Sequence, residues 1–383
     1  MDKVASAVED KTFLWGPQGS FDPEVIPAPD RDVGALQLFQ SFLCNNEDEA
    51  AGLSNVLTLW ELIPKYTADQ LNYLDVLPND YQTDFTIYNN KFKLTVFPGT
   101  YYPKGPKNKS DVEAAPKRRF PGFREQVVEQ ALIHLATQQA RAELVNNKVS
   151  YYVTFSIREL YSVLRSMGRS QSHYQIREAL EVLTSSIITI KSSGGTETTS
   201  RYPIVPSFSN TSSADELVKG RDVWKIALHP LVINAIQNST YRQYPLAPSV
   251  PLAGFAAYLL RQMFFSAPNI SGAHPLKVSL LDLSSRTPGL EMKTMRASIN
   301  AMIRELDKMR DGGLLEEYEV IEILPKRKGR GRPAPVDAEF VLYPGTSWIR
   351  DVKAGSKRLA LTEKALALAR SQRDSRQKSL PFL

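Results

Sequence analysis

The chain has 383 residues, which is enough for two or three domains that each bury a hydrophobic core. Its formal net charge of +6 is unevenly distributed: residues 1–115 hold 9 Lys and Arg against 17 Asp and Glu, whereas the rest of the chain holds 38 against 24. A basic body of this kind favours a polyanion such as nucleic acid as partner. There is no apolar run of about 18 residues and no apolar core near Met1, which argues against a membrane span and a signal peptide, and the single cysteine, Cys44, excludes an internal disulfide and indicates the reducing cytoplasm.

The first 84 residues are acidic, interrupted by prolines and poor in clear periodicity. We interpret residues 1–84 as a partly ordered N-terminal extension and assign no chemistry to them. Within it, Leu36–Leu43 and Leu53–Ile63 are predicted to form short helices.

Residues 85–240 are predicted to form the first of two α+β domains. Side chains alternate in Phe85–Tyr102, which indicates a β-hairpin that turns at Asn89 and Asn90. Residues 103–119 are rich in Lys, Pro and Gly and are predicted to be a basic loop of this domain.

The middle of this domain is predicted to alternate helix and strand. Phe123–Ala140 is a helix by its spacing, and Val149–Phe155 has the composition of a strand. One stripe of this helix is apolar and contains Val127, Ala131, Leu132 and Leu135.

Two capping pairs indicate where the next two helices begin. Ser156 with Glu159, and Ser172 with Gln175, have the spacing in which each pair satisfies two free N–H groups at a helix start. The outward face of the second helix consists of Gln171, Tyr174, Gln175 and Glu178. This helix is less basic than its counterpart in the second domain and carries Glu178 and Glu181, and the loop Gly194–Ser200 has no cation. We therefore assign this domain phosphate contacts or protein pairing more than base reading.

The end of the first domain is predicted to contain a hairpin and a connecting element. Ile187–Ser192 and Tyr202–Phe208 are the strands of the hairpin. Trp224–Asn238 reads as a strand that runs into a helix, and we interpret it as a bridge between the two halves of the chain.

Residues 241–348 are predicted to repeat the same order of elements as a second domain. Pro251–Ala267 is a buried helix, and His274–Leu283 starts extended and becomes helical. Glu291–Met309 is a long amphipathic helix that ends at Gly312 and Gly313. The last two strands are Tyr318–Ile323 and Ala338–Tyr343.

The long helix should present donors on the side opposite its core face. At about 100° per residue, with Ile299 pointing inward, Ala297 and Ala301 lie on the outer side among polar and basic residues. Such a surface lets a helix approach phosphates and base edges closely. The candidate DNA contacts are Lys293, Thr294, Arg296, Ala297, Asn300 and Arg304.

The tip of the second hairpin is strongly basic. Residues 326–333 read KRKGRGRP, and their R-G-R-P end is similar to an AT-hook, whose arginines lie in narrow A·T minor grooves. A helix followed by a basic hairpin indicates a winged helix, with the helix in the major groove and the hairpin along the backbone or minor groove. The candidate contacts at the tip are Lys326, Arg327, Lys328, Arg330 and Arg332.

Residues 349–383 are predicted to form a helix, Leu361–Arg373, and a basic tail. The tail ends QKSLPFL, which has the form of a short peptide that docks in a hydrophobic groove. It resembles bacterial sliding-clamp binding peptides through Gln377, Leu380 and Pro381, with Phe382 in place of a final leucine. Lys378 departs from the leucine usual in such peptides. The alternative is an unstructured terminus.

These two tandem winged helices resemble the iteron-binding plasmid replication initiators of the RepA and TrfA type. The resemblance covers residues 120–343 and rests on the order of elements, with GRSQSHYQIREALEVLTSS, HPLKVSLLDL and MKTMRASINAMIRELDKMRDGGLLEEYEV as the segments that carry it. It implies binding to direct repeats in double-stranded origin DNA and recruitment of host replication proteins, among them the sliding clamp, a helicase or a host initiator. It also implies control of plasmid copy number through an exchange between repressing homodimers and active monomers.

The sequence gives no sign of an enzyme, a metal site or a cofactor. It lacks a G-x-x-x-x-G-K-[ST] phosphate-binding loop, and its four histidines are isolated. Two alternatives remain open. A winged-helix transcriptional repressor would use the same helices on an operator, and a nicking enzyme would need a tyrosine close to histidines or carboxylates.

Overall fold

The protein is described by a computed structural model in which residues 52–361 are largely placed. The gaps in that range are 68–71, 73–75, 88–89, 104–114, 146–147, 193–198, 207, 212–221, 239, 247–251, 253, 267–274, 287–293, 326–332 and 358–359. Residues 13–15, 35–36, 39–40, 42–44, 364 and 367 are described in addition.

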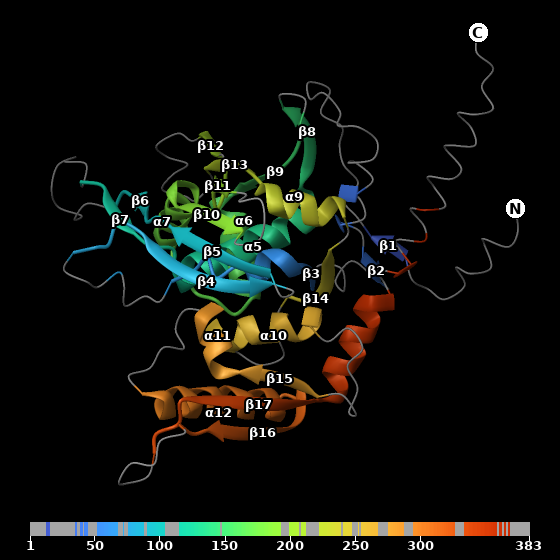
Figure 1. Ribbon diagram of the computed structural model, residues 1–383. Helices are drawn as coiled ribbons and strands as arrows, with labels where there is room; N and C mark the ends of the chain where they lie inside the picture. The colour runs from blue at the N-terminus through green and yellow to red at the C-terminus, as the bar shows by residue number, and fades with distance from the viewer. Residues whose placement is uncertain are drawn as a thin grey trace, which may run out of the picture.

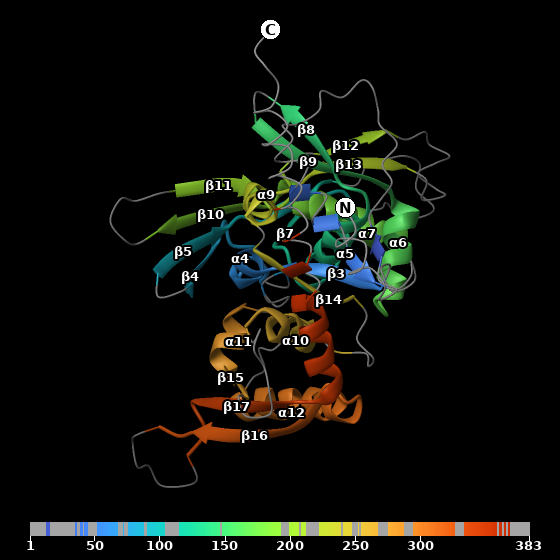
Figure 2. The ribbon, with the colours of Figure 1, turned by 90° about the vertical axis from the view of Figure 1, so that its right-hand side faces the viewer.

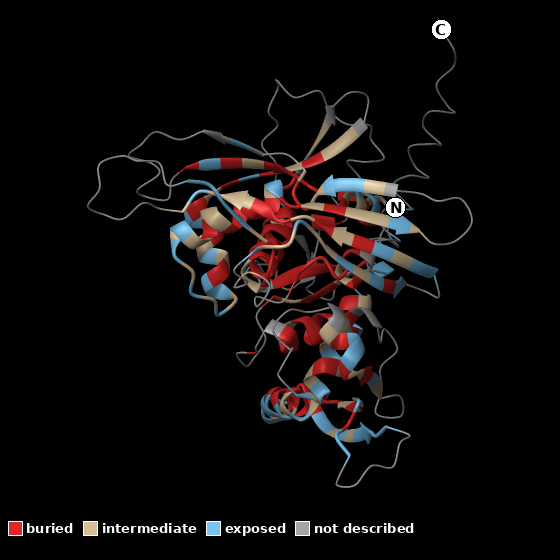
Figure 3. Ribbon diagram, turned by 60° about the vertical axis from the view of Figure 1, so that its left-hand side comes forward, coloured by how far each residue is buried: buried red, intermediate tan, exposed pale blue. Residues whose placement is uncertain are grey.

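The chain forms a larger N-terminal unit, the upper part of Figure 1, and a smaller C-terminal unit below it. Each unit combines helices with antiparallel sheet, and every strand pair among the described residues is antiparallel. Buried residues gather in the centre of each unit (Figure 3). The prediction that helices and strands are mixed throughout the chain is therefore confirmed.

The helix α5 (Phe123–Gln139) lies at the centre of the N-terminal unit. The predicted apolar stripe is buried, and burial extends around the whole helix, because every residue from Glu125 to Thr137 is buried. Strands β3 and β9 and helices α6 and α7 all pack against it, so no side of α5 is left to water. Its polar residues, such as Glu129 and His134, therefore need partners inside the protein.

Two four-stranded sheets flank this helix and are separate in Figure 2. The first has the order β11-β10-β5-β4. The hairpin predicted about Asn89 and Asn90 is confirmed, since β4 ends at Ile87 and β5 begins at Asn90. The strands of this sheet are β4 (Tyr81–Ile87), β5 (Asn90–Val96), β10 (Ile187–Ser192) and β11 (Thr199–Pro203).

The second sheet has the order β12-β13-β9-β8. The predicted strand followed by a helix is confirmed as β13 and α9 (Pro230–Gln237). Its interpretation as a bridge between the halves is wrong, because Ile226 of β13 and Val232 and Ile236 of α9 are buried in the core of the N-terminal unit. The strands are β8 (Arg141–Val145), β9 (Lys148–Ser156), β12 (Phe208–Thr211) and β13 (Val223–Ala227).

Both predicted capping boxes are present. Glu159 N donates to Ser156 Oγ at 3.2 Å and Ser156 N donates to Glu159 Oε2 at 2.6 Å, at the start of α6 (Ile157–Ser166). The pair of Ser172 and Gln175 does the same for α7 (His173–Ser185), at 3.3 and 2.8 Å. Local spacing was sufficient to locate both helix starts.

The C-terminal unit has the predicted order of elements. Strand β15 joins the outer side of β17, so its sheet has the order β15-β17-β16. Helices α10 and α12 supply much of the core, including Leu259, Met263, Met302 and Leu306. The elements are α10 (Gly254–Ser266), β15 (Leu276–Ser279), α11 (Leu280–Arg286), α12 (Met295–Asp311), β16 (Leu315–Ile323) and β17 (Asp337–Pro344).

The two units repeat the order of their elements but pair their strands differently. In the C-terminal unit, the strand before the helix pair joins the hairpin that follows it. In the N-terminal unit, β9 pairs with β8 and β13, whereas the hairpin β10–β11 pairs with β5. The predicted duplication therefore holds for the order of elements and not for the sheets.

Residues 53–67 are not part of a peripheral extension. Leu53–Ile63, predicted as a helix, is the buried strand β3 (Leu53–Leu57) followed by the short helix α4 (Thr58–Leu62). Strand β3 pairs with β14 (Tyr241–Pro245), far away in sequence. Val56 and Leu62 contribute to the core of the C-terminal unit, and Leu57, Trp60, Ile63 and Tyr66 to that of the N-terminal unit. The segment therefore joins the two cores.

The remaining expectations concern the two ends of the chain. The helix predicted over Leu36–Leu43 cannot include its last two residues, because Phe42–Cys44 is strand β2, paired with β1 (Phe13–Trp15). The C-terminal helix begins at residue 346, earlier than predicted, and residues 360, 361, 364 and 367 are also helical. The rest of the predicted helix Leu361–Arg373 lies outside the described residues.

Candidate nucleic-acid interface

Helix α12 separates an apolar face from a polar one. Ile299, Met302, Leu306 and Met309 are buried in the core of the C-terminal unit. Arg296, Asn300 and Arg304 are exposed, and their spacing of four residues places them in one stripe along the helix. At about 1.5 Å per residue the stripe is roughly 12 Å long, similar to the width of the B-DNA major groove.

The predicted outward face is narrower than expected. Ala301 is only 3% exposed and belongs to the core of the C-terminal unit, and Ser298 is buried as well. Ala297 is half-buried. The polar stripe therefore has one small residue beside it rather than two.

Thr294 has a defined structural role at the start of α12. Its Oγ1 accepts a hydrogen bond from Ala297 N at 3.2 Å, which caps the helix. The remaining N–H groups of the first turn and the helix dipole make this end favourable for anions. Lys293, which was predicted to lie beside it, is outside the described residues.

Cations along α12 differ in whether an acid neutralises them. Near the C-terminal end, Lys308 Nζ lies 2.7 Å from Glu305 and an Arg310 Nη lies 2.9 Å from Asp307. Within the described part of the chain, Arg296 and Arg304 form no ion pair. The charge available to a phosphate or a base therefore lies in the N-terminal two thirds of the helix.

The hairpin β16–β17 runs back along α12. Tyr318 Oη donates to Asp307 at 2.7 Å, and the Arg310 guanidinium lies 5.8 Å from the Tyr318 ring. The free end of the hairpin, where Ile323 pairs with Asp337, consequently lies toward the N-terminal end of α12 (Figure 1). The five predicted tip contacts, Lys326, Arg327, Lys328, Arg330 and Arg332, lie outside the described residues.

The outer strand of this hairpin is acidic, a feature that the sequence interpretation missed. Four glutamates of β16 are exposed. They would repel phosphates, so this strand is unfavourable for contact with DNA. The alternation LEEYEVIEI could have shown this. The four residues are Glu316, Glu317, Glu319 and Glu322.

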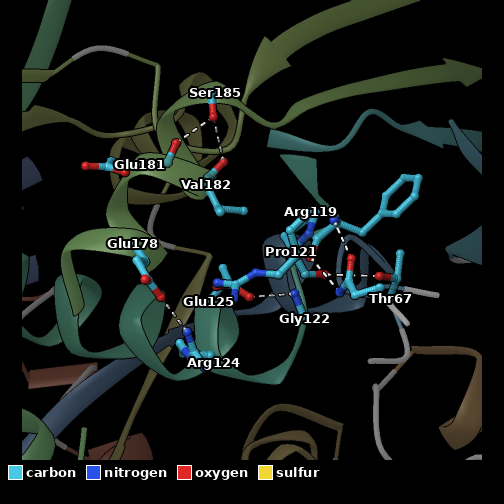
Figure 4. A network of polar contacts seen from close by, with 12 residues as sticks. Thr67, Arg119, Pro121, Gly122, Arg124, Glu125, Glu178, Glu181, Val182 and Ser185 are labelled. Atoms are coloured by element: carbon cyan, nitrogen blue, oxygen red, sulfur yellow. Dashed lines mark hydrogen bonds and ion pairs between the residues drawn. The ribbon is translucent and has the colours of Figure 1, made fainter. Parts of the chain in front are cut away.

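The predicted residues on α7 are only partly available. Tyr174 is 42% exposed, Gln171 is half-buried, and Gln175 is engaged in the capping box through its side-chain oxygen. Glu178 is neutralised by Arg124 at 3.1 Å (Figure 4), and Glu181 accepts a hydrogen bond from Tyr102 N at 2.9 Å. Burial raises the pKa of Glu181. The face is therefore less acidic than its sequence implies.

The histidines that the structure describes lie in separate environments. His134 and His229 are buried, and burial lowers the pKa of His134 to about 4 and that of His229 to about 3. His173 lies edge-on to the Tyr161 ring. No group of three or more His, Cys, Asp or Glu among the described residues is arranged to hold a metal ion, and no described helix is long and apolar enough to cross a membrane.

Comparison with known proteins gives no match to a family model and none to a curated protein. Among solved structures, the chain is similar to domains 2 and 3 of RctB, with 12% identity over 75% of this chain and 98% of that one, at a TM-score of 0.43. A second structure of RctB domains 2–3 gives 10% identity, 76% and 99% coverage and a TM-score of 0.41. The Pi initiator protein in complex with iteron DNA gives 11% identity, 58% and 94% coverage and a TM-score of 0.35. At these values the likeness assigns no role to individual residues of this chain.

Proposed function

We propose that this protein binds double-stranded DNA in a sequence-specific manner and initiates replication at directly repeated origin sites. The observation that carries the proposal is the exposed stripe of Arg296, Asn300 and Arg304, because its two arginines have no ion-pair partner in the described structure. Arginine pairs with two acceptors of guanine and asparagine with the N6 and N7 positions of adenine. The stripe therefore offers side chains that can read bases, over a length similar to the width of one major groove.

The C-terminal unit is proposed to act as a winged helix. Helix α12 would enter the major groove, and the β16–β17 hairpin would bring its basic tip to the flanking backbone or minor groove. The order of elements and the position of the hairpin along α12 support this arrangement. The acidic outer face of β16 would remain turned away from the duplex.

The N-terminal unit is proposed to act as a second winged helix with a modified sheet. Its helix α7 corresponds in order to α12, but it offers Tyr174 and half-buried glutamines instead of exposed arginines. This composition suits contacts with the sugar–phosphate backbone, which position a protein on DNA without reading sequence. We propose a binding protein without catalytic activity.

A footprint on the DNA that flanks the coding region tests this function. We expect protection of several direct repeats beside an A·T-rich segment. Protection of one palindrome would instead identify a transcriptional repressor. If no segment were protected more strongly than random DNA at the same salt concentration, sequence-specific binding itself would be refuted.

The C-terminal residues are proposed to recruit the host sliding clamp. Gln377, Leu380 and Phe382 lie outside the described residues, and their spacing alone supports this role. Deletion of residues 377–383 should leave the footprint unchanged and weaken retention of the chain by immobilised clamp. Substitution of the preceding Arg376 by alanine is the control, because it removes charge and keeps the peptide. Undiminished retention after the deletion would rule out the docking role.

A homodimer and contacts with a helicase or a host initiator belong to the same proposal. They follow from the role of an origin-binding protein that must control copy number and assemble a replication complex. Sedimentation of the chain with and without DNA repeats measures whether it is a monomer or a homodimer. A monomer under both conditions would exclude an exchange between dimers and monomers.

A further inference from the structure

A two-stranded hairpin beside α7 carries two cations that no acid in the described part of the chain neutralises. It is formed by β6 (Gly99–Tyr101) and β7 (Lys117–Arg119), which pair from Gly99 with Arg119 to Tyr101 with Lys117. Lys117 and Arg118 are both exposed, and neither forms an ion pair with another described residue. The hairpin therefore presents two adjacent positive charges to solvent.

The hairpin is held firmly against α7. Thr100 N donates to Ser185 Oγ at 2.7 Å, and Tyr102 N donates to Glu181 Oε2 at 2.9 Å. A Cβ at Gly99 would overlap the backbone oxygen of Val182, so the close approach of β6 to the helix requires glycine at this position. Strand β6 consequently covers the C-terminal half of α7.

A third attachment joins the hairpin to the central helix. Arg119 forms an ion pair with Glu125 of α5, and its guanidinium lies 5.0 Å from the Tyr101 ring. The same carboxylate accepts a hydrogen bond from Gly122 N at 2.8 Å (Figure 4). Because Arg119 points inward, its strand neighbour Arg118 points to the opposite side, toward solvent. Lys117 leaves the strand on the Arg119 side and is exposed at the first residue of β7, so the two free charges flank the strand.

The surface between this hairpin and the open end of α7 is suited to an anionic partner. Its two carboxylates are engaged, Glu178 by Arg124 and Glu181 by the backbone of Tyr102. Tyr174 lies seven residues before Glu181, which is about 10 Å along the helix. A duplex seated on Tyr174 would therefore have one of its phosphate strands at the hairpin.

We propose that Lys117 and Arg118 bind the DNA backbone beside the groove that α7 faces, so that the β6–β7 hairpin acts as a second basic arm of the N-terminal unit. This inference rests on the proposed DNA-binding function and extends it to a surface that the sequence interpretation treated only as part of a basic loop. The contact is electrostatic and independent of sequence. It would fix the position of the N-terminal unit on each repeat.

The test compares the double variant Lys117→Ala/Arg118→Ala with Lys353→Ala/Lys357→Ala, which removes the same charge from exposed positions of the C-terminal helix. The slope of log affinity against log salt should fall by about 1.8 for the hairpin variant, at about 0.9 for each phosphate contact, and stay unchanged for the control. Hydroxyl-radical footprints should lose protection at one edge of each repeat. Circular dichroism confirms that the variants are folded.

An unchanged slope in the hairpin variant, or an equal fall in the control, would overturn the inference. The proposed function is judged separately, from whether the unsubstituted chain prefers repeat DNA over random DNA. If that preference persists while the hairpin variant binds like the parent, only the hairpin contact is refuted. Retention of the edge protection in the hairpin variant would refute the contact as well.

Discussion

Substitution of Arg296 and Arg304 by alanine is expected to abolish the preference for origin repeats. Each lost bidentate base contact should cost about 1–3 kcal/mol, which is roughly a 5- to 150-fold loss of affinity at the cognate site. The two side chains are exposed and lie eight residues apart on one face of α12, so both can reach a single groove. Asn300→Ala, between them, should relax discrimination at one base pair.

A control variant must separate the loss of base reading from the loss of positive charge on α12. Lys308 lies on the same helix, but Glu305 neutralises it at 2.7 Å, so Lys308→Ala should change cognate binding much less than Arg304→Ala. Competition binding with repeat DNA and with random DNA at one salt concentration measures directly how strongly each variant prefers the repeats. Equal losses on the two DNAs would show that Arg296 and Arg304 contact phosphates and do not read bases.

Local sequence patterns predicted the elements that carry this site. The spacing of Met295, Ile299, Met302 and Leu306 located α12 and its buried face, and Ser156 and Ser172 located two helix starts. These features depend on residues three or four positions apart, which interact within one helix. The order of elements in the C-terminal unit followed from the same local signals.

Features that depend on distant contacts escaped prediction. Leu53–Leu57 was read as helical, but it forms a strand because β14, almost 190 residues later, offers a partner edge. Ala301 is predicted to point outward, but it is buried in the core of the C-terminal unit, because the width of the buried face depends on elements that are not part of α12. The burial of the polar side of α5 escaped prediction for a similar reason, since elements from distant parts of the chain pack around that helix.

The buried polar cluster around Glu129 is the part of the fold that periodicity could least predict. Lys65 Nζ lies 3.3 Å from Glu129 Oε2 and 4.2 Å from the centre of the Trp60 ring, and it donates to Trp60 O at 2.9 Å. Trp60 Nε1 donates to Glu129 Oε1 at 2.8 Å. Burial raises the pKa of Glu129, and the charge of Lys65 opposes that rise.

This cluster fixes the segment that joins the two units. Glu61, next to Trp60, forms an ion pair with Arg261 of α10 at 3.2 Å, and Tyr258 Oη donates to Glu61 O at 3.2 Å. Lys65 and Glu129 therefore hold residues 60–65 on the N-terminal core while Glu61 holds the C-terminal unit. The two attachments therefore act on neighbouring residues of one segment.

The variant Lys65→Met is expected to lower the free energy of unfolding by about 3–5 kcal/mol, because it leaves the Glu129 carboxylate buried without its cation. Without Lys65 the folded-state pKa of Glu129 rises further above its unfolded value. The resulting penalty is fully present above the folded-state pKa and disappears as pH falls below the unfolded one. Urea unfolding should therefore show a larger deficit at neutral pH than at acidic pH.

Two controls isolate the buried charge as the cause. Lys65→Met/Glu129→Gln removes both charges and keeps an acceptor for Trp60 Nε1, so it should recover much of the lost stability. Lys225→Met breaks a more exposed pair with Glu143, and a loss of only about 0–1 kcal/mol is expected there. If Lys65→Met were no more destabilising than Lys225→Met, the cluster would not be what fixes residues 53–67. The orientation of α7 relative to α12 would then have to depend on the pairing of β3 with β14.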